Sequence, residues 1–170
     1  ELSVPQDEKN FLYLSQQAGR TREDYGFSDT YEEHEYFLKG SANIYDIKDG
    51  KLATASNAAK ATSSNAQEEY VDRIIVFKPK DAADFSGVVF VDILNASSKT
   101  DIASLWRQSY DYIMEKGAAY VGVTSKDVTV KSLKTFNQDR YAALKWGDDN
   151  GIFWDILGQV GTLLKQENSP

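Results

Sequence analysis

One stretch of the sequence has the arrangement in which open α/β sheets place their chemistry. A near-continuous apolar run over residues 87–94 ends in Asn95-Ala96-Ser97 and leads, through residues 98–101, into an amphipathic helix pattern. Loops that follow the carboxyl end of a buried strand and enter a helix commonly hold ligands and reacting groups. Asn95, Ala96 and Ser97 are therefore the candidate site residues. The competing interpretation is a simple turn in which the Asn95 side chain bonds its own backbone.

The side chains needed for nucleophilic catalysis are not assembled in this sequence. His34 is the single histidine, and it lies in the carboxylate-rich segment 30–35, ahead of the first predicted strand. We interpret it as a surface residue and not as the base of a Ser-His-Asp triad. Ser97 and Ser98 have neither a G-x-S-x-G setting nor a histidine partner, so neither is expected to be a nucleophile. No residue of this chain is assigned a catalytic role.

Two further groups of residues allow a functional interpretation, but each has a simpler structural one. Asp148 and Asp149 resemble a carboxylate pair for acid–base chemistry, yet they precede a predicted helix. Carboxylates at that position cap the first turn and oppose the helix dipole. Trp106 and Trp154 lie on predicted helices and are expected in the core, whereas Trp146 fits either a pocket or the core.

The composition excludes several classes of function. The 170 residues include no cysteine, which excludes disulfides, thiolate metal ligands and cysteine nucleophiles. The net charge is −7 with scattered Lys and Arg, so neither nucleic acid nor an anionic membrane surface is an expected partner. Histidine and carboxylates do not cluster, and no glycine-rich loop follows the apolar strand, so no metal and no nucleotide cofactor is predicted. No stretch approaches the ~20 apolar residues of a membrane span.

The length predicts a single domain, with residues 1–30 as a polar N-terminal arm. The sequence begins at Glu1 instead of Met, from which we expect an upstream segment to have been removed or omitted. Together with the lack of cysteine, this start slightly favours a secreted or periplasmic protein, although the compartment stays unknown.

Hydrophobic periodicity predicts an alternation of strands and helices. The pattern indicates two short strands within 34–48 with a turn or bulge between them at Lys39-Gly40. It also indicates a tight turn at Asp49-Gly50, a loop over 53–66, and strands at 70–77, 87–94 and 118–124. It also indicates helices over 102–116, capped by Thr100 or Asp101, and over 152–164, with residues 125–146 wrapping the surface. The strand, helix and strand over 87–124 form a predicted parallel βαβ unit. Because strand 87–94 is apolar on both faces, we expect both faces to be covered.

Five ordered segments resemble a family of α/β-hydrolase-domain proteins. Residues 31–45 resemble its Y-x-E-x-E-Y-F-x-x-G-x-A-N-x-Y segment, residues 89–97 its V-V-V-E-x-L-N-V-S strand and loop, residues 117–124 its G-Y-A-Y-V-G-V-S, residues 136–141 its F-D-P-x-R-Y, and Asp148-Asp149 with Ile152-Phe153 the start of the helix before the nucleophile strand. The resemblance implies an α/β fold with a partial α/β-hydrolase sheet: N-terminal antiparallel strands, then parallel strands with crossover helices.

The resemblance also implies a function that this chain fulfils only in part. Residues 31–170 correspond to the N-terminal portion of the hydrolase domain, while the half with the nucleophile elbow, the acid and the histidine is not among them. The implied activity is that of a serine hydrolase, an esterase acting on a small ester, without a cofactor. A backbone N–H of Asn95, Ala96 or Ser97 then belongs to the oxyanion hole. This chain alone is expected to be inactive.

The resemblance further implies a partner. In that sheet, strand 87–94 lies between strand 118–124 and the first strand of the C-terminal half, so one of its edges is bare in this chain. We therefore expect the C-terminal half of the same protein, as a second chain or a missing segment, or an edge-to-edge homodimer. Two alternatives stay open: a non-catalytic flavodoxin-like ligand-binding or interaction module, and a structural domain that uses the scaffold to bind a partner.

Overall fold

The computed structural model describes residues 30–46, 60–61, 67–147 and 150–166. Six strands lie in this part of the chain: β1 (Tyr31–Asn43), β2 (Tyr45–Asp46), β3 (Lys60–Ala61), β4 (Gln67–Pro79), β5 (Val89–Ile93) and β6 (Ala119–Val123). The helices are α1 (Ser104–Glu115), α2 (Asp127–Phe136), α3 (Gln138–Tyr141) and α4 (Phe153–Leu163), with short 3-10 turns η4 (Ala82–Asp84) and η5 (Asn150–Ile152).

The main sheet has four strands in the order β1-β4-β6-β5. β1 pairs antiparallel with β4 along its whole length, and β4 pairs antiparallel with β6. β5 and β6 are parallel neighbours joined through α1. The predicted fold class, antiparallel strands followed by a parallel βαβ unit, is confirmed, and strand 118–124 is the neighbour of strand 87–94 as expected.

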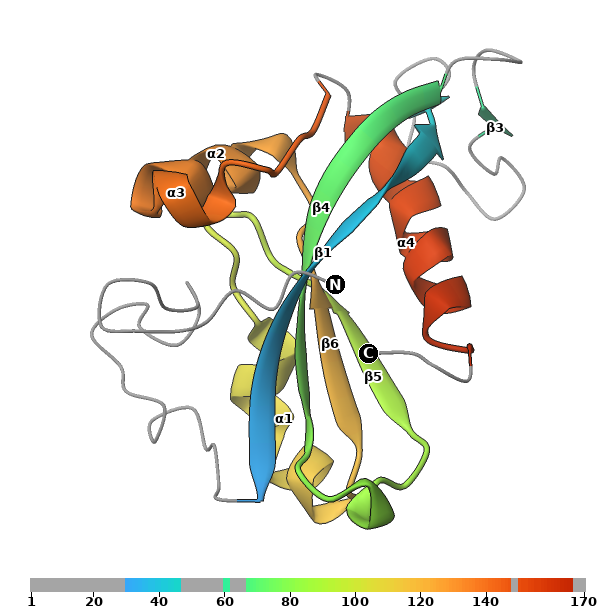
Figure 1. Ribbon diagram of the computed structural model, residues 1–170, viewed down its shortest axis with the longest axis vertical. Helices are drawn as coiled ribbons and strands as arrows, with labels where there is room; N and C mark the ends of the chain where they lie inside the picture. Colours follow the sequence, from blue (N-terminus) through green and yellow to red (C-terminus); the bar gives the residue numbers. More distant parts are fainter. Residues whose placement is uncertain (1–29, 47–59, 62–66, 148–149, 167–170) are drawn as a thin grey trace.

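Helices cover both faces of this sheet (Figure 1). On one face α1 packs against Phe77 and Tyr120, and further along the same face Phe37 of β1 packs with residues of α2 and α3. On the other face α4 covers Ile74 and Val121, residues that alternate with those of the first face. The βαβ unit and α4 were predicted from their apolar periodicity, and both are confirmed.

The break expected at Lys39-Gly40 within 34–48 is misplaced, because β1 runs unbroken to Asn43 and the short β2 follows at Tyr45–Asp46. Lys39 and Gly40 lie inside β1, paired one to one with Val71 and Tyr70 of β4, and form neither a turn nor a bulge. A Cβ at Gly40 would lie 2.9 Å from the Tyr70 hydroxyl, so this glycine makes room for a cross-strand tyrosine. His34 also lies within β1 and not ahead of the first strand.

The loop expected over residues 53–66 is corrected in its one described part. Lys60–Ala61 form β3, which pairs antiparallel with β2. The rest of that segment, the predicted turn at Asp49-Gly50 and the N-terminal arm up to residue 29 lie outside the described residues.

Residues 125–146, expected to wrap the surface, contribute core residues instead. They form α2 and α3, from which Val130, Leu133 and Tyr141 are buried against Phe37. Their apolar positions follow helical spacing, but the intervening polar residues obscured the pattern in the sequence.

Strand β5 does not have the two covered faces that its apolar sequence predicted. Val91 and Ile93 are 41% and 44% exposed, whereas Phe90 packs partly beneath α1. The reason is position: β5 is the last strand of the sheet order, and the buried residues that contact α4 come from β1, β4 and β6.

The sequence predicted the C-terminus of helix α1 better than its N-terminus. Its N-terminus has no capping bond from Thr100 or Asp101; instead Asp92 of β5 accepts a hydrogen bond from the Leu105 N–H at 3.1 Å. Its C-terminus lies at Glu115, one residue before the predicted end, and is followed by Gly117 with φ +58°.

The two helical tryptophans lie in different surroundings. Trp106 is buried in the core as expected, but Trp154 on α4 is 58% exposed, so its predicted core position is wrong. Trp154 directly follows the buried Phe153, and on a helix neighbouring residues point in different directions.

Gly117→Ala tests how tightly the turn between α1 and β6 is specified. The variant is expected to lower the free energy of unfolding by roughly 1–3 kcal/mol, because a left-handed residue and a close backbone contact are both violated. The new Cβ would lie 2.3 Å from the Asp84 carbonyl oxygen. Urea denaturation of variant and parent measures the difference.

The matched control is Gly158→Ala on α4, where a Cβ meets nothing within 4 Å. Alanine there is expected to stabilise the protein by about 0.5–1 kcal/mol through helix propensity. Equal effects at the two positions would contradict the structural role assigned to Gly117.

Candidate functional site

The loop after β5 is closed at its base by backbone hydrogen bonds. The Asn95 N–H donates to the Ile102 carbonyl at 2.9 Å, and the Ile102 N–H donates back to the Asn95 carbonyl at 3.1 Å. Inside the loop, the Asn95 side chain accepts from the Ser97 N–H at 2.8 Å, and the Lys99 N–H donates to the Ala96 carbonyl at 2.9 Å. The Asn95 side chain therefore bonds the backbone of its own turn, as the competing interpretation of this loop predicted.

The three candidate backbone donors differ in availability. The N–H groups of Asn95 and Ser97 are used within the loop, whereas the Ala96 N–H has no acceptor among the described residues. Ala96 is half-buried, and Asn95 and Ser97 are exposed. An unused N–H beside the carboxyl end of a parallel strand can donate to a bound oxygen atom.

The carboxyl end of β6 holds the start of this loop in place. The Leu94 N–H donates to the Val123 carbonyl at 3.0 Å, and the Ser125 hydroxyl donates to the Leu94 carbonyl at 2.8 Å. Leu94 itself is fully buried in the core beneath α1. The loop therefore leaves the sheet from a fixed point.

A buried network of charges lies on the sheet face that carries α1, α2 and α3. Glu35 of β1 accepts hydrogen bonds from Arg73 Nε of β4, from Arg140 Nε of α3 at 2.8 Å and from the Tyr141 hydroxyl at 3.0 Å. The guanidinium groups of both arginines also lie 5.7 Å from the centre of the Tyr141 ring. One carboxylate thus links two strands and α3.

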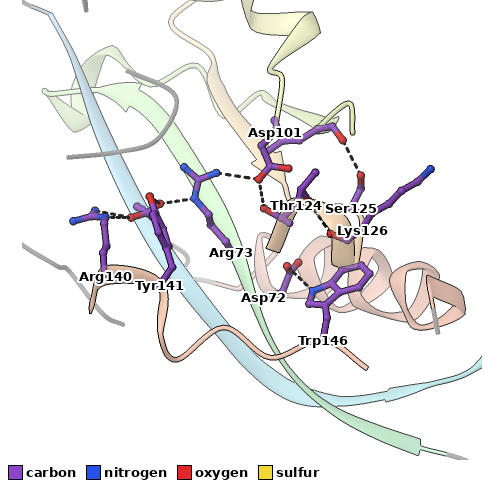
Figure 2. Close-up of polar contacts among 12 residues, drawn as sticks. Asp72, Arg73, Asp101, Thr124, Ser125, Lys126, Arg140, Tyr141 and Trp146 are labelled. Atoms are coloured by element: carbon purple, nitrogen blue, oxygen red, sulfur yellow. Dashed lines mark hydrogen bonds and ion pairs between the residues drawn. The ribbon is translucent and has the colours of Figure 1, made fainter. Parts of the chain in front are cut away.

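The same network reaches the candidate loop through Asp101 (Figure 2). Asp101 Oδ2 lies 3.2 Å from Arg73 Nη1 and accepts from the Thr124 hydroxyl at 2.6 Å. Arg73 and Thr124 are also joined by their backbones, since the Thr124 N–H donates to the Arg73 carbonyl at 3.0 Å. Asp101, Arg73 and Thr124 are all fully buried.

The pKa values in the network follow from burial and pairing. Burial by itself lowers the pKa of Arg73, but Glu35, Tyr141 and Asp101 outweigh it, so the pKa is raised and the guanidinium keeps its charge. Burial raises the pKa of Asp101, while Arg73 and the Thr124 hydroxyl oppose that rise. The two arginines and two carboxylates that are joined by ion pairs balance in formal charge.

A third buried carboxylate, Asp72, faces the opposite side of the sheet. Its Oδ1 accepts from Trp146 Nε1 at 2.9 Å, and its Oδ2 has no partner among the described residues. Burial raises the pKa of Asp72 to about 8, although the Trp146 hydrogen bond acts in the other direction. Trp146, whose role the sequence left open, is therefore the hydrogen-bond donor to a buried acid.

The other residues considered from the sequence lie away from this network. His34 Nε2 lies 2.9 Å from Glu32 Oε1 and the imidazole is partly exposed, consistent with a surface residue. Ser97 and Ser98 are exposed on the loop, and Asp148 and Asp149 lie outside the described residues.

Sequence reasoning missed the charged residues that the fold brings together. A usable signal was present: Asp72-Arg73 interrupts an otherwise apolar strand, which marks charges that must be paired when buried. Two of the resemblance segments also meet here, because Glu35 lies in residues 31–45 and Arg140-Tyr141 end residues 136–141.

Metal-binding clusters and membrane-spanning helices are both absent from the described residues. Within 30–46, 60–61, 67–147 and 150–166, no group of three or more His, Cys, Asp or Glu side chains could hold a metal ion. In the same part of the chain, no helix has the length and apolar character needed to cross a bilayer.

Asp72→Asn tests the raised pKa of this buried acid. A carboxyl whose pKa rises from 3.8 to about 8 on folding binds its proton more tightly in the folded state. Its contribution to stability is therefore complete below pH 4 and is lost as the pH rises to 8, by up to about 1.4 kcal/mol per pH unit. The variant, which cannot ionise, is expected to lose less stability over this range.

Denaturant unfolding of both proteins from pH 4 to pH 8 measures the difference in slope. Asp111→Asn is the matched control, because Asp111 is an exposed residue of α1. The control is expected to follow the parent. Parallel curves for the parent and Asp72→Asn would contradict the raised pKa.

Comparison with known proteins places the fold and the loop in context. The sequence model of the alpha/beta hydrolase domain family matches residues 4–170, nearly the whole chain. Comparisons with curated proteins and with solved structures give no significant match. The matched region includes the four-stranded sheet, the loop after β5 and every residue of the buried network. On this evidence, the chain belongs to the alpha/beta hydrolase domain family.

Proposed function

We propose that this chain is the N-terminal part of a serine-type α/β-hydrolase, an esterase that acts on a small ester. In this proposal the chain supplies half of the sheet and one oxyanion donor, and a C-terminal part of the protein supplies the nucleophile, the acid and the histidine. The observation that carries the proposal is the open edge of β5, a strand with one charged residue, directly before the candidate loop.

The sheet order supports this division. Among the described residues β5 pairs with β6 alone, so its other edge can receive one more strand. If that strand runs parallel to β5, its carboxyl end lies at the same edge of the sheet as Asn95, Ala96 and Ser97. In α/β-hydrolases the nucleophile elbow sits at the carboxyl end of such a strand. A nucleophile there would lie beside the loop that follows β5.

Ala96 is the favoured oxyanion donor in this arrangement. Its N–H is unused among the described residues, whereas those of Asn95 and Ser97 donate within the loop. A backbone donor aimed at the developing oxyanion contributes roughly 3 kcal/mol to transition-state stabilisation. Such a donor does not react itself, so it needs a nucleophile from elsewhere in the protein.

The chain's own histidine does not fit the role of base for the loop serines. His34 lies on β1 and Ser97 lies in the loop after β5, and β1 and β5 are the two opposite edge strands of the sheet. Three strand spacings separate those strands by about 14 Å. Direct proton transfer requires a hydrogen-bond distance of about 3 Å.

The flavodoxin-like alternative is less well supported. That fold has an all-parallel sheet, whereas β1, β4 and β6 form two successive antiparallel pairs here. No described contact favours the purely structural alternative over the hydrolase.

Enzyme activity tests the proposal directly. Residues 1–170 alone are expected not to hydrolyse short p-nitrophenyl esters, because a donor without a nucleophile stabilises no reaction. The polypeptide encoded by the complete reading frame is expected to hydrolyse them and to contain a G-x-S-x-G-like elbow after residue 170. Release of p-nitrophenolate measures both. Turnover by residues 1–170 that Ser97→Ala abolishes would contradict the proposal.

Association tests the proposed partner at the β5 edge. Residues 1–170 are expected not to behave as a free 19.0 kDa monomer but to bind the C-terminal part of the protein or, without it, to pair edge to edge. Val91→Lys is expected to weaken that association at least tenfold, because Val91 is an exposed apolar residue of the open strand. Light scattering and co-purification of the two parts measure it.

Phe136→Lys is the matched control. Phe136 is 40% exposed, close to the 41% of Val91, but it ends α2 and lies away from β5. The control is expected to leave association unchanged. A stably folded monomer of residues 1–170 that ignores the C-terminal part would overturn the proposed partner.

A further inference from the structure

We propose that Asp101 is a positioning residue for the loop that carries Ala96, acting through Thr124 and Arg73. The inference rests on the proposed function, since it assigns a purpose to the shape of this loop. It adds to that function a residue that touches neither the substrate nor the nucleophile.

Asp101 is the anchor by which the far end of the loop is held. Among residues 95–101, Asp101 is the only one whose side chain is fully buried; the others are exposed or half-buried. The paired backbones of Asn95 and Ile102 close the loop at its base. Because Asp101 immediately precedes Ile102, its side chain fixes the position of the last residues of the loop. The position of Ala96 within the loop therefore depends both on the Asn95–Ile102 pairing and on the Asp101 anchor.

The partners of Asp101 are themselves held rigidly. Thr124 follows β6, and its hydroxyl donates to Asp101 Oδ2 at 2.6 Å. Arg73 lies in the middle of β4, and its Nε donates to Glu35, which Arg140 and Tyr141 also bind. Through these partners, Asp101 connects the loop to β1, β4, the end of β6 and α3.

The loop needs such an anchor because part of its backbone is unfavourable. Lys99 has φ +60°, a left-handed conformation that costs a non-glycine residue roughly 1–2 kcal/mol. Its carbonyl accepts a hydrogen bond from the Ser132 hydroxyl of α2. A strained conformation persists only where surrounding contacts determine it, and the Asp101 anchor supplies such contacts on the other side of the loop.

Positional accuracy is what an oxyanion donor requires. The donor must lie 2.7–3.1 Å from the developing oxyanion, and a misplacement of about 1 Å can cost about 100-fold in rate. A residue that sets the donor's position should therefore affect kcat more than KM. A residue with a purely structural role would instead affect stability, without this kinetic split.

Thr124→Val and Thr124→Ser form the decisive pair of variants. Valine keeps the branched shape of threonine but removes the hydroxyl that bonds Asp101, and it leaves every charge of the network in place. Serine keeps that hydroxyl. Asp101→Asn is a harsher variant, because it leaves the arginines with one carboxylate fewer and can unfold the protein. Asp111→Asn on the surface of α1 is the control for loss of an aspartate charge.

The kinetic measurement uses the complete hydrolase with a short p-nitrophenyl ester. Thr124→Val is expected to lower kcat about 10- to 100-fold with KM changed less than about twofold. Thr124→Ser is expected to retain kcat within about threefold, and Asp111→Asn to match the parent. Equal losses in the valine and serine variants, or a loss confined to KM, would overturn the positioning role.

Amide hydrogen exchange tests the anchor independently of activity. In Thr124→Val, the amides of residues 95–101 are expected to exchange about tenfold faster, while those of β4 and β6 keep their protection. Unchanged exchange in the loop would overturn the inference, as would a uniform acceleration across the sheet.

Ala96→Pro separates the inference from the proposed function. Proline removes the proposed donor N–H, so kcat is expected to fall strongly in the folded complete protein. If kcat stays unchanged while Thr124→Val still loosens residues 95–101, Ala96 is not the oxyanion donor, the assigned role of the loop fails, and the anchoring by Asp101 is upheld. If Ala96→Pro lowers kcat but Thr124→Val alters neither kcat nor exchange, the proposed function is upheld and the positioning role of Asp101 is overturned.

Discussion

The ion pairs that join Glu35, Arg73 and Asp101 are the interaction on which the arrangement of this molecule depends. Glu35 belongs to β1, Arg73 to β4 and Asp101 to the loop after β5, so one chain of buried charges connects segments from three parts of the sequence. All three side chains are shielded from water. Removing one of them would leave an unpaired buried charge, which typically costs 3–5 kcal/mol. The relative positions of the strands and the loop are therefore coupled.

Stability alone does not explain why charges occupy this part of the core. Desolvation offsets most of the attraction in a buried ion pair, and apolar side chains can be equally stabilising. What the charges add here is geometry. On one face of the sheet they separate the apolar cluster beneath α1 from the cluster beneath α2 and α3. Apolar contacts tolerate small shifts, whereas hydrogen bonds weaken when their direction changes. The loop after β5 is attached at the boundary, where its position is determined by direction as well as by contact.

The extent to which the sequence predicted this structure depends on how local each signal is. The βαβ unit and α4 follow from apolar spacing within a few turns or strand residues, and their prediction was correct. The break expected at Lys39-Gly40 was wrong, because the glycine is there to leave space for the side chain of Tyr70 on the neighbouring strand. The network was missed for the same reason: Glu35 and Arg140 are 105 residues apart, and Arg73 and Asp101 are 28 apart. The sequence identified the loop residues as candidates. It could not show which backbone N–H stays unused, because that depends on the bond from Asn95 to the Ile102 carbonyl and on the turn closed by the Asn95 side chain.

The two outer strands of the sheet differ in a way that connects fold to function. β1 carries Glu32 and Lys39, and charged side chains protect an outer strand from pairing with another chain. In β5, Val91 and Ile93 are exposed on the sheet face that carries α4, and the one charged residue, Asp92, is committed to the Tyr120 hydroxyl and to the first turn of α1. Addition of a further strand is therefore favoured at β5 and opposed at β1. The candidate loop begins at the end of this same strand, so the segment proposed to complete the sheet at β5 would also complete the surroundings of Ala96.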